Sequence, residues 1–328
     1  MIKDSYGRTL NYLRLAVTDR CNLRCTYCMP KEGLDWLPNK ELMTNEEMLK
    51  LCSVFVNMGV EKIRITGGEP FVRKDFLPLL EDLSQLKGLR ELSLTTNGLL
   101  TAPWVPELKR LGISTVNLSL DTLDKDRFFQ ITRRNSFGQV MKTLDALLSH
   151  GIDVKINAVV MENINTADII PMVRLTEKLP VSVRFIEEMP FNGSDQQVSL
   201  TWDHFRILEL IREAFPSIYK TVDPPHSTAY NYKIPGHIGE IGIIAAYTRS
   251  FCGSCNRIRI TPTGMLRTCL YDQGIFNMKD ALREGRTDEE LENRITQAIL
   301  KKAETGWEAE NNRDQQETVH ESMATIGG

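Results

Sequence analysis

Histidine is scarce in this chain: five occur among 328 residues, and none precedes His150. No apolar run is long enough to span a bilayer, which argues against a membrane protein. The net charge is only -3 and basic tracts are lacking, so nothing favours a nucleic-acid partner. Because residues 1–8 lack the apolar core of a signal peptide, we expect a cytoplasmic protein.

Cysteine, by contrast, is well represented. Seven cysteines cluster at close spacings, and in a reducing cytosol this pattern indicates metal ligation more than disulfides. Hydrophobic residues make up 41% of the chain and charged residues 25%, which suits a globular protein with one large core or two domains.

Six short β-like runs are separated by helix-like stretches. The runs cover residues 12–18, 62–66, 91–95, 115–120, 154–160 and 181–186. A helix is predicted over residues 44–58, because Thr44 and Glu47 have the spacing of a capping box. Repeated βα units imply a parallel sheet with helices outside. The sequence therefore predicts an α/β fold, an incomplete (β/α)6 TIM-like barrel.

A polar stretch over residues 191–197 follows the sixth run and predicts a domain boundary. We expect residues 1–195 to form the partial barrel. Residues 196–328 would then form a smaller C-terminal domain.

Three cysteines in a C-x3-C-x2-C array, Cys21, Cys25 and Cys28, directly follow the first run. A structural zinc ion requires a fourth ligand, yet no histidine is near and the next cysteine, Cys52, lies in the predicted helix as a core residue. A zinc knuckle and a redox dithiol are the simpler alternatives. A [4Fe-4S] cluster held by three cysteines would leave one iron free to bind a small molecule.

The array resembles the signature of the radical S-adenosylmethionine (SAM) superfamily, with Tyr27 at its aromatic position. This resemblance implies a partial TIM-like barrel and a catalytic cluster on the three cysteines. Its open iron would chelate the amino and carboxylate groups of SAM. One electron from the cluster would then cleave a carbon-sulfur bond and give a deoxyadenosyl radical.

The residues that end the predicted strands fit this resemblance, because such barrels carry their chemistry at the carboxyl ends of the strands. Thr66-Gly67-Gly68-Glu69-Pro70 could be an ordinary βα turn, but it resembles the superfamily's GGEP element, which binds the amino end of SAM. The resemblance implies a SAM site made of Tyr27, Gly67, Gly68, Glu69, Ser119 and Met189, with Thr95 nearer the substrate.

A second array, C-x2-C-x13-C, is formed by Cys252, Cys255 and Cys269. His237 lies fifteen residues before the first of them, a spacing that matches no common zinc pattern but leaves a zinc ribbon as the alternative. The histidines show no mutual spacing typical of a metal or catalytic site. We expect a second [4Fe-4S] cluster with an open iron here.

Six cations occupy positions where charges rarely lie unless they are paired or face a wet cavity. They are Arg14, Arg64, Lys155, Arg184, Arg257 and Arg259. Guanidinium groups favour bidentate contacts with phosphate oxygens, so six cations converging on a barrel lumen would suit a triphosphate. For each of them, a structural ion pair is the alternative.

Two three-cysteine arrays and the terminal Gly327-Gly328 narrow the resemblance to the radical SAM enzymes that cyclise GTP at the start of molybdenum cofactor biosynthesis. It implies a lyase that makes (8S)-3',8-cyclo-7,8-dihydroguanosine 5'-triphosphate from GTP. The second cluster would contact the guanine and the cations would hold the triphosphate. Cyclic pyranopterin monophosphate synthase would act next, and a low-potential donor would supply electrons.

The terminal glycines have two interpretations. Chain ends are usually disordered, and the sequence alone favours that; the resemblance implies that Gly327 and Gly328 enter the barrel. Other function classes also stay open: a radical SAM peptide maturase, or an electron-transfer protein with two clusters. The oligomeric state, a homodimer included, is not fixed by the sequence.

Overall fold

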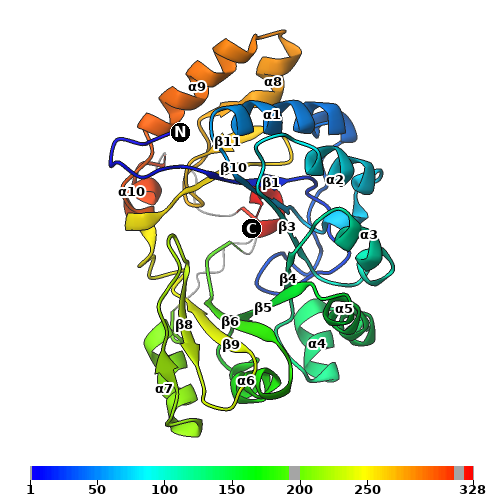
Figure 1. Ribbon diagram of the computed structural model, residues 1–328, viewed down its shortest axis with the longest axis vertical. Coiled ribbons are helices and arrows are strands. Elements are labelled where there is room, and N and C mark those ends of the chain that lie inside the picture. The colour runs from blue at the N-terminus through cyan, green and yellow to red at the C-terminus, as the bar shows by residue number, and fades with distance from the viewer. Residues whose placement is uncertain (1, 192–199, 314–320, 328) are drawn as a thin grey trace.

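The computed structural model describes residues 2–191, 200–313 and 321–327. One 12-stranded sheet runs through it in the order β12-β11-β10-β1-β2-β3-β4-β5-β6-β9-β8-β7 (Figure 1). Its strands are β1 Tyr12–Ala16, β2 Lys62–Thr66, β3 Glu91–Thr96, β4 Thr115–Ser119, β5 Asp153–Val160, β6 Val181–Glu187, β7 Tyr219–Lys220, β8 Ala229–Lys233, β9 Glu240–Ile244, β10 Arg257–Ile260, β11 Met265–Arg267 and β12 Phe276–Asn277. The domain boundary expected at residue 195 lies outside the described residues.

Strands β1 to β6 pair in sequence order and are all parallel, so the predicted parallel sheet is confirmed. The sequence did not reveal that two later strands extend it. β10 pairs in parallel with β1, and β9 pairs in parallel with β6. Antiparallel strands follow at both edges. The C-terminal part of the chain therefore continues the barrel sheet on both sides.

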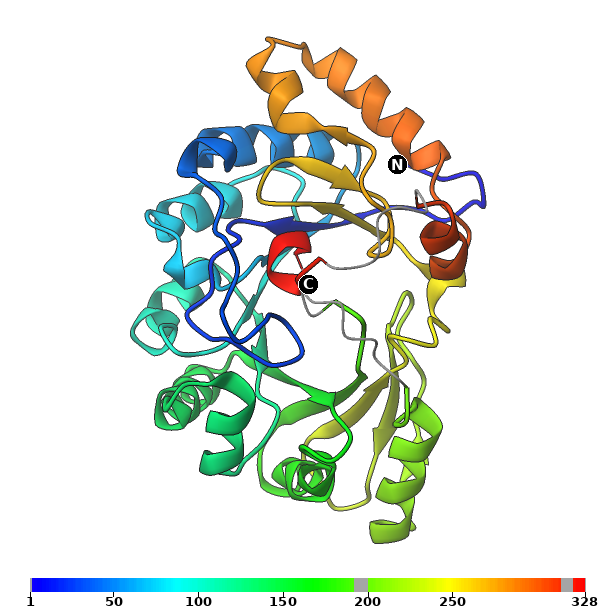
Figure 2. The same cartoon turned by 180° about the vertical axis from the view of Figure 1, so that it is seen from behind.

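Helices cover the outer face of the sheet (Figures 1 and 2). They are α1 Asn45–Asn57, α2 Phe76–Ser84, α3 Val105–Arg110, α4 Lys125–Thr132, α5 Phe137–Ser149, α6 Ile169–Lys178, α7 His204–Ala214, α8 Met278–Arg283, α9 Asp288–Leu300, α10 Gly306–Asn311 and α11 Met323–Ile326. The exceptions are α10, whose first residue lines a cavity described below, and α11, which lies within the curve of the sheet. Among the described residues, no helix is long and apolar enough to cross a membrane.

The capping box predicted for α1 is present. Thr44 Oγ1 accepts a hydrogen bond from Glu47 N at 3.2 Å, and Glu47 Oε2 accepts one from Thr44 N at 2.8 Å. Helix α1 turns its apolar face to the sheet, and Cys52 on that face is 0% exposed. This confirms Cys52 as a core residue, apart from either cysteine array.

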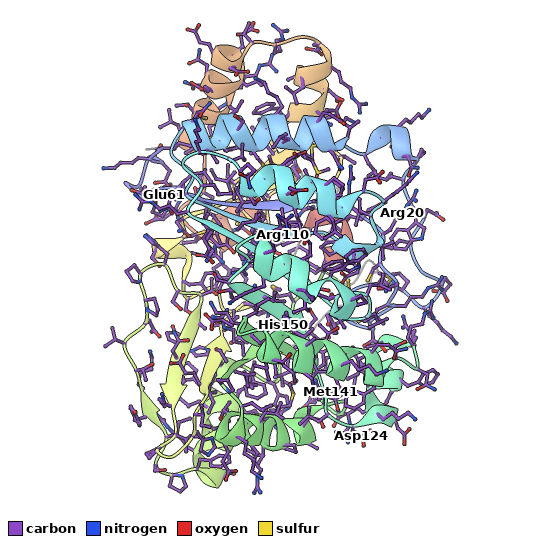
Figure 3. The ribbon with its side chains drawn as sticks, turned by 45° about the vertical axis from the view of Figure 1, so that its right-hand side comes forward. Arg20, Glu61, Arg110, Asp124, Met141 and His150 are labelled. Atoms are coloured by element: carbon purple, nitrogen blue, oxygen red, sulfur yellow. The ribbon has the colours of Figure 1, made fainter. Side chains whose placement is uncertain are left out.

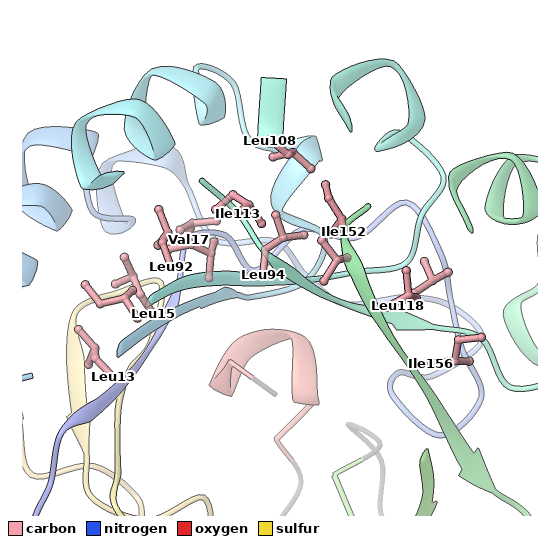
Figure 4. Close-up of a cluster of buried hydrophobic side chains, with 14 of the residues drawn as sticks. Leu13, Leu15, Val17, Leu92, Leu94, Leu108, Ile113, Leu118, Ile152 and Ile156 are labelled. Atoms are coloured by element: carbon pink, nitrogen blue, oxygen red, sulfur yellow. The ribbon is translucent and has the colours of Figure 1, made fainter. Parts of the chain in front are cut away.

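The main core lies between the strands and the outer helices. Figure 4 shows part of this core, where apolar side chains of β1, β3, β4 and β5 pack together, among them Leu13, Leu15 and Leu94. Along β5 and β6, buried residues alternate with less buried ones, which include Lys155, Asn157 and Arg184. Because side chains alternate between the faces of a strand, these polar side chains share the second face of the sheet. The lumen is therefore lined by polar as well as apolar side chains.

Candidate active site

The lumen holds two adjoining cavities. We call the one lined by Cys21, Cys25 and Cys28 the first-array cavity. The one lined by Cys252, Cys255 and Cys269 is the second-array cavity. They share the lining residues Thr95, Asn157, Ile186, Met189 and Met323. The two arrays, which are far apart in the sequence, therefore face one continuous lumen.

Backbone and side-chain contacts fix the loop that carries the first array. Cys21 Sγ accepts hydrogen bonds from Leu23 N at 3.4 Å and from Asn97 Nδ2 at 3.7 Å. Tyr27 OH donates to Asp121 Oδ2 at 3.1 Å. Since Asn97 follows β3 and Asp121 follows β4, the strand ends themselves hold this loop in place.

The Gly67-Gly68 turn explains why glycine is needed after β2. A Cβ on Gly67 would lie 2.4 Å from Thr18 O, and one on Gly68 would lie 2.1 Å from Arg20 O. Gly67 also has φ 131°, which side chains disfavour. The turn therefore packs directly against the backbone that leads into the first array, and both glycines line the first-array cavity.

The structure places Ser119, Met189 and Tyr27 along the first-array cavity, as the resemblance implies, and Thr95 along both cavities. Glu69 is different, because it is 0% exposed and does not line either cavity. Its carboxylate accepts from Thr96 Oγ1 at 2.9 Å and from Asn97 N at 2.7 Å. Burial raises the pKa of Glu69 to about 7, against these hydrogen bonds. Glu69 thus braces the ends of β2 and β3 behind the cavity.

The second array has a different electrostatic setting. Burial alone would raise the pKa of Cys255, but the charges of Arg257 and Lys302 lower it to about 5. Lys302 is 3% exposed, and its Nζ donates to Thr268 O. The zinc-ribbon alternative lacks its fourth ligand, because His237 Nδ1 instead lies 2.8 Å from Thr176 Oγ1.

The donor sets suit clusters better than single ions. Among the residues that the structure describes, no three His, Cys, Asp or Glu side chains converge closely enough to hold one ion, whereas zinc needs its sulfur ligands about 2.3 Å away. A cubane cluster spreads its thiolates over separate irons. Burial, followed by the nearby Glu69, raises the pKa of Cys21 to about 12. The thiols of the first array therefore hold their protons until a metal displaces them.

Five of the six predicted cations line the second-array cavity: Arg14, Arg64, Arg184, Arg257 and Arg259. The register places Arg14 between Arg64 and Arg259 on adjacent strands. Within the described ranges, none of the six cations forms an ion pair. The buried Nε atoms of Arg14, Arg64 and Arg184 also have no hydrogen-bond partner there.

Crowding of like charges shows in the titration of these groups. Burial, with repulsion from Arg64, lowers the pKa values of both Arg14 and Arg184 to about 10. Lys155 does not line either cavity. Burial, followed by repulsion from Arg184 and Arg64, still lowers its pKa to about 8. Repulsion among these cations, which form no ion pair with the described residues, destabilises the folded protein. A bound anion would offset that repulsion and accept the free hydrogen-bond donors.

The chain end meets both arrays. Ser322 Oγ donates to Cys28 O at 2.6 Å, and Met323 lines both cavities. Arg259 Nη1 donates to Gly327 O at 2.8 Å. The described tail therefore lies inside the barrel, while Gly328 lies outside the described residues.

Sequence reasoning missed several polar side chains in and beside this lumen, and two of them have a buried oxygen without a partner among the described residues. Asn157 lines both cavities and its buried Oδ1 has no partner in the described part of the chain; its position two residues after Lys155 on β5 could have revealed it. Tyr12 is the other, with a buried hydroxyl that likewise has no partner there. Burial alone would raise the pKa of Tyr12, but Arg64, Arg14 and Lys62 together lower it.

Two known families match successive parts of the chain. The Radical SAM superfamily matches residues 15–176, and Molybdenum Cofactor Synthesis C matches residues 181–307. In the solved structures, the Streptococcus suis protein SuiB is similar with a TM-score of 0.63 at 18% identity, over 90% of this chain and 72% of that chain. At that identity the likeness shows the fold alone, and it confirms the predicted fold class.

Curated relatives are similar over nearly the whole chain. "GTP 3',8-cyclase, mitochondrial" of Arabidopsis thaliana is 40% identical over 100% of this chain and 84% of its own length. "GTP 3',8-cyclase" of Clostridium perfringens is 39% identical over 92% of this chain and 94% of its own length. "Molybdenum cofactor biosynthesis protein 1" of Bos taurus is 42% identical over 92% of this chain, but the chain spans only 48% of that relative.

Proposed function

Since this chain belongs to the GTP 3',8-cyclase family of the radical SAM superfamily, we propose that it converts GTP to (8S)-3',8-cyclo-7,8-dihydroguanosine 5'-triphosphate. This is the first step of molybdenum cofactor biosynthesis. One observation carries the proposal: both cysteine arrays open onto one lumen, which also gathers five arginines that form no ion pair with any described residue.

Membership of the superfamily implies a [4Fe-4S] cluster and SAM. When bound, this pair supplies a 5'-deoxyadenosyl radical by one-electron cleavage of SAM. We assign the cluster to Cys21, Cys25 and Cys28, and the SAM site to the first-array cavity. There the Gly67-Gly68 turn exposes backbone to the ligand, and Asp121 holds Tyr27 in place. Glu69 supports the turn from behind.

The second-array cavity is the proposed GTP site. Cys252, Cys255 and Cys269 would hold a second [4Fe-4S] cluster, which would supply a binding site for the guanine. The lumen arginines would bind the triphosphate, and Arg14, Arg64 and Arg184 have an Nε without a partner among the described residues. Lys155 lies outside the cavity lining but close enough to interact electrostatically with Arg184 and Arg64, and it would add its charge to theirs. Thr95 and Asn157, which line both cavities, would then lie between the two ligands. In this proposal, residues 1–195 form the domain that binds SAM and the first cluster, and residues 196–328 form the domain that holds the second cluster.

The product would pass to cyclic pyranopterin monophosphate synthase, and a low-potential donor would supply the electron. The peptide-modifying alternative has a structural counterpart, the SuiB structure bound to precursor peptide SuiA. At 17% identity that likeness concerns the fold alone. An electron carrier binds no triphosphate, so that function would not explain a cluster of arginines that form no ion pair with the described residues.

The proposal is tested by anaerobic incubation of the reconstituted protein with GTP, SAM and dithionite. We expect 5'-deoxyadenosine together with a nucleotide product isomeric with GTP, both identified by mass analysis. A peptide maturase would form 5'-deoxyadenosine without consuming GTP, and an electron carrier would form neither. Either outcome would overturn the proposed function.

Replacing Arg184 by glutamine is expected to weaken GTP binding and to leave SAM binding unchanged. A charge-assisted hydrogen bond contributes about 1.5 to 3 kcal/mol, or roughly 10- to 150-fold in Kd. Because the lumen cations repel one another, the same change should also raise the Tm of the protein without GTP. Calorimetric titration with GTP and thermal unfolding measure the two effects.

The matched control for Arg184 is Arg110→Gln on the outer surface (Figure 3). Arg110 pairs with Glu81 at 2.8 Å, and its side chain is 57% exposed. Its loss should leave GTP binding unchanged. Equal GTP affinity in Arg184→Gln and the parent would show that the lumen arginines do not hold the triphosphate.

GTP affinity should also depend on pH through Lys155, whose pKa is lowered to about 8 by burial and by Arg184. Below pH 8 this lysine is charged before GTP arrives. Above pH 8 it must regain a proton to pair with the triphosphate, so affinity should fall by up to about tenfold per pH unit. Binding measured from pH 7 to 9 checks this. Lys155→Met should bind more weakly at pH 7 and lose the slope; an unchanged slope would contradict the assignment.

A further inference from the structure

Arg249 lies beside the second array in an unusual stack. Its guanidinium carbon is 3.4 Å from the centroid of the Tyr271 ring and 3.8 Å from that of Trp307. Nη2 pairs with Glu310 Oε2 at 2.7 Å, and the side chain is 3% exposed. A desolvated cation between two aromatic faces is held strongly in position.

The stack joins the two chain segments that carry the second array. Arg249 is three residues before Cys252, whose backbone N donates to Arg249 O at 3.3 Å. Tyr271 is two residues after Cys269 and, like Arg249, lines the second-array cavity. Movement of the guanidinium would therefore disturb the loops of both cysteines.

A third segment is tied in by α10. This helix supplies Trp307 and Glu310 to the stack, and its first residue, Gly306, donates its backbone N–H to Cys252 Sγ at 3.4 Å. A Cβ on Gly306 would lie 2.7 Å from Arg249 Cδ. Only glycine therefore allows the helix to approach both the arginine and the sulfur.

Stability does not account for this arrangement. Arg249 Nε and Nη1 are buried without an acceptor in the described ranges, and the residue has a left-handed backbone with φ 56°. Unmet buried donors and a positive φ both cost free energy. The residue therefore has more to contribute to geometry than to the free energy of unfolding.

We propose that Arg249 is a positioning residue that locks α10 over the second array, so that the N–H of Gly306 stays hydrogen-bonded to Cys252 Sγ. This inference rests on the proposed second cluster. Hydrogen bonds to a cluster's sulfur ligands stabilise its more negative, reduced form and so raise its reduction potential. Outer contacts of this kind typically change metal affinity or activity by 10- to 100-fold.

The test compares Arg249→Met, Trp307→Leu and Gly306→Ala in the full chain, reconstituted anaerobically with iron and sulfide. The midpoint potential of each cluster is measured by a redox titration followed by electron paramagnetic resonance. SAM is added to identify the signal of the first cluster. We expect a more negative second potential in all three variants, by about 59 mV for a tenfold change in a one-electron equilibrium. Iron loss to a chelator should be faster.

Trp202→Leu is the matched control, because the guanidinium carbon of Arg206 lies 4.3 Å from the centroid of the Trp202 ring and neither residue lines either cavity of the lumen. It should leave both potentials unchanged. A shift in Arg249→Met alone would indicate a plain charge effect and would overturn the positioning role. Parent potentials in all three variants would overturn it as well, with the proposed function intact. If the parent protein assembles no second cluster, the proposed function fails too.

Discussion

Changing Cys25 to serine is expected to abolish SAM cleavage and, with it, all product from GTP. Three thiolates are the fewest that hold a cluster with one open iron, and among the described residues no other cysteine or histidine lines the first-array cavity. A serine hydroxyl is a poor replacement, because soft thiolates are the ligands that iron-sulfur clusters use. The same result is expected for Cys21→Ser and Cys28→Ser. The measurement is 5'-deoxyadenosine after anaerobic incubation, with iron content determined in parallel.

Two control variants make this result specific. Cys52→Ala alters the buried cysteine of α1 outside both arrays, and it should keep SAM cleavage. Cys269→Ser should keep some uncoupled 5'-deoxyadenosine but form no cyclised nucleotide, because only the second array is changed. Near-stoichiometric zinc in the first array, with no iron gained on reconstitution, would contradict the cluster assignment.

The sequence predicted the barrel well because its signals are local. The runs that became β1 to β6 are separated by helices, so order and direction follow from the connection rules for βα units. β9 and β10 could not be assigned in this way. β9 pairs with β8 in antiparallel fashion on one side and with β6 in parallel on the other. β10 directly follows the Cys252–Cys255 loop and pairs with β1, which is remote in the sequence. Their partners are set by tertiary packing, which overrides local propensity.

The candidate site was predictable where residue spacing carries the chemistry. The two arrays and the Gly67-Gly68 turn are of this kind. Side-chain direction was not predictable, because it depends on partners that are remote in sequence. Glu69 belongs to the same motif as the two glycines, yet it turns to Thr96 and Asn97 behind the cavity. The link from Arg249 to α10 likewise joins residues that the sequence separates widely.

The chain end supplies the second large effect. Gly327 has φ 74°, and a Cβ there would lie 2.8 Å from the Cβ of Ala16 at the end of β1. Arg259 Nη1 donates to its carbonyl, and Ser322 anchors the start of α11 to the first-array loop. The tail thus connects Arg259, which is proposed to bind the triphosphate, with the loop that carries the first array. This packing favours a tail that completes the active site.

Removing Gly327 and Gly328 is expected to reduce the product from GTP strongly. Both clusters, SAM binding and uncoupled 5'-deoxyadenosine should persist, because the truncation leaves every cysteine in place. Gly327→Ala should act in the same direction, through its positive φ and the contact with Ala16. Gly285→Ala is the matched control: Gly285 has φ 77°, but a Cβ there would meet nothing within 4 Å. The measurement is the rate of product formation at saturating GTP and SAM. If the truncated protein forms product as fast as the full-length protein, the tail does not take part in the reaction.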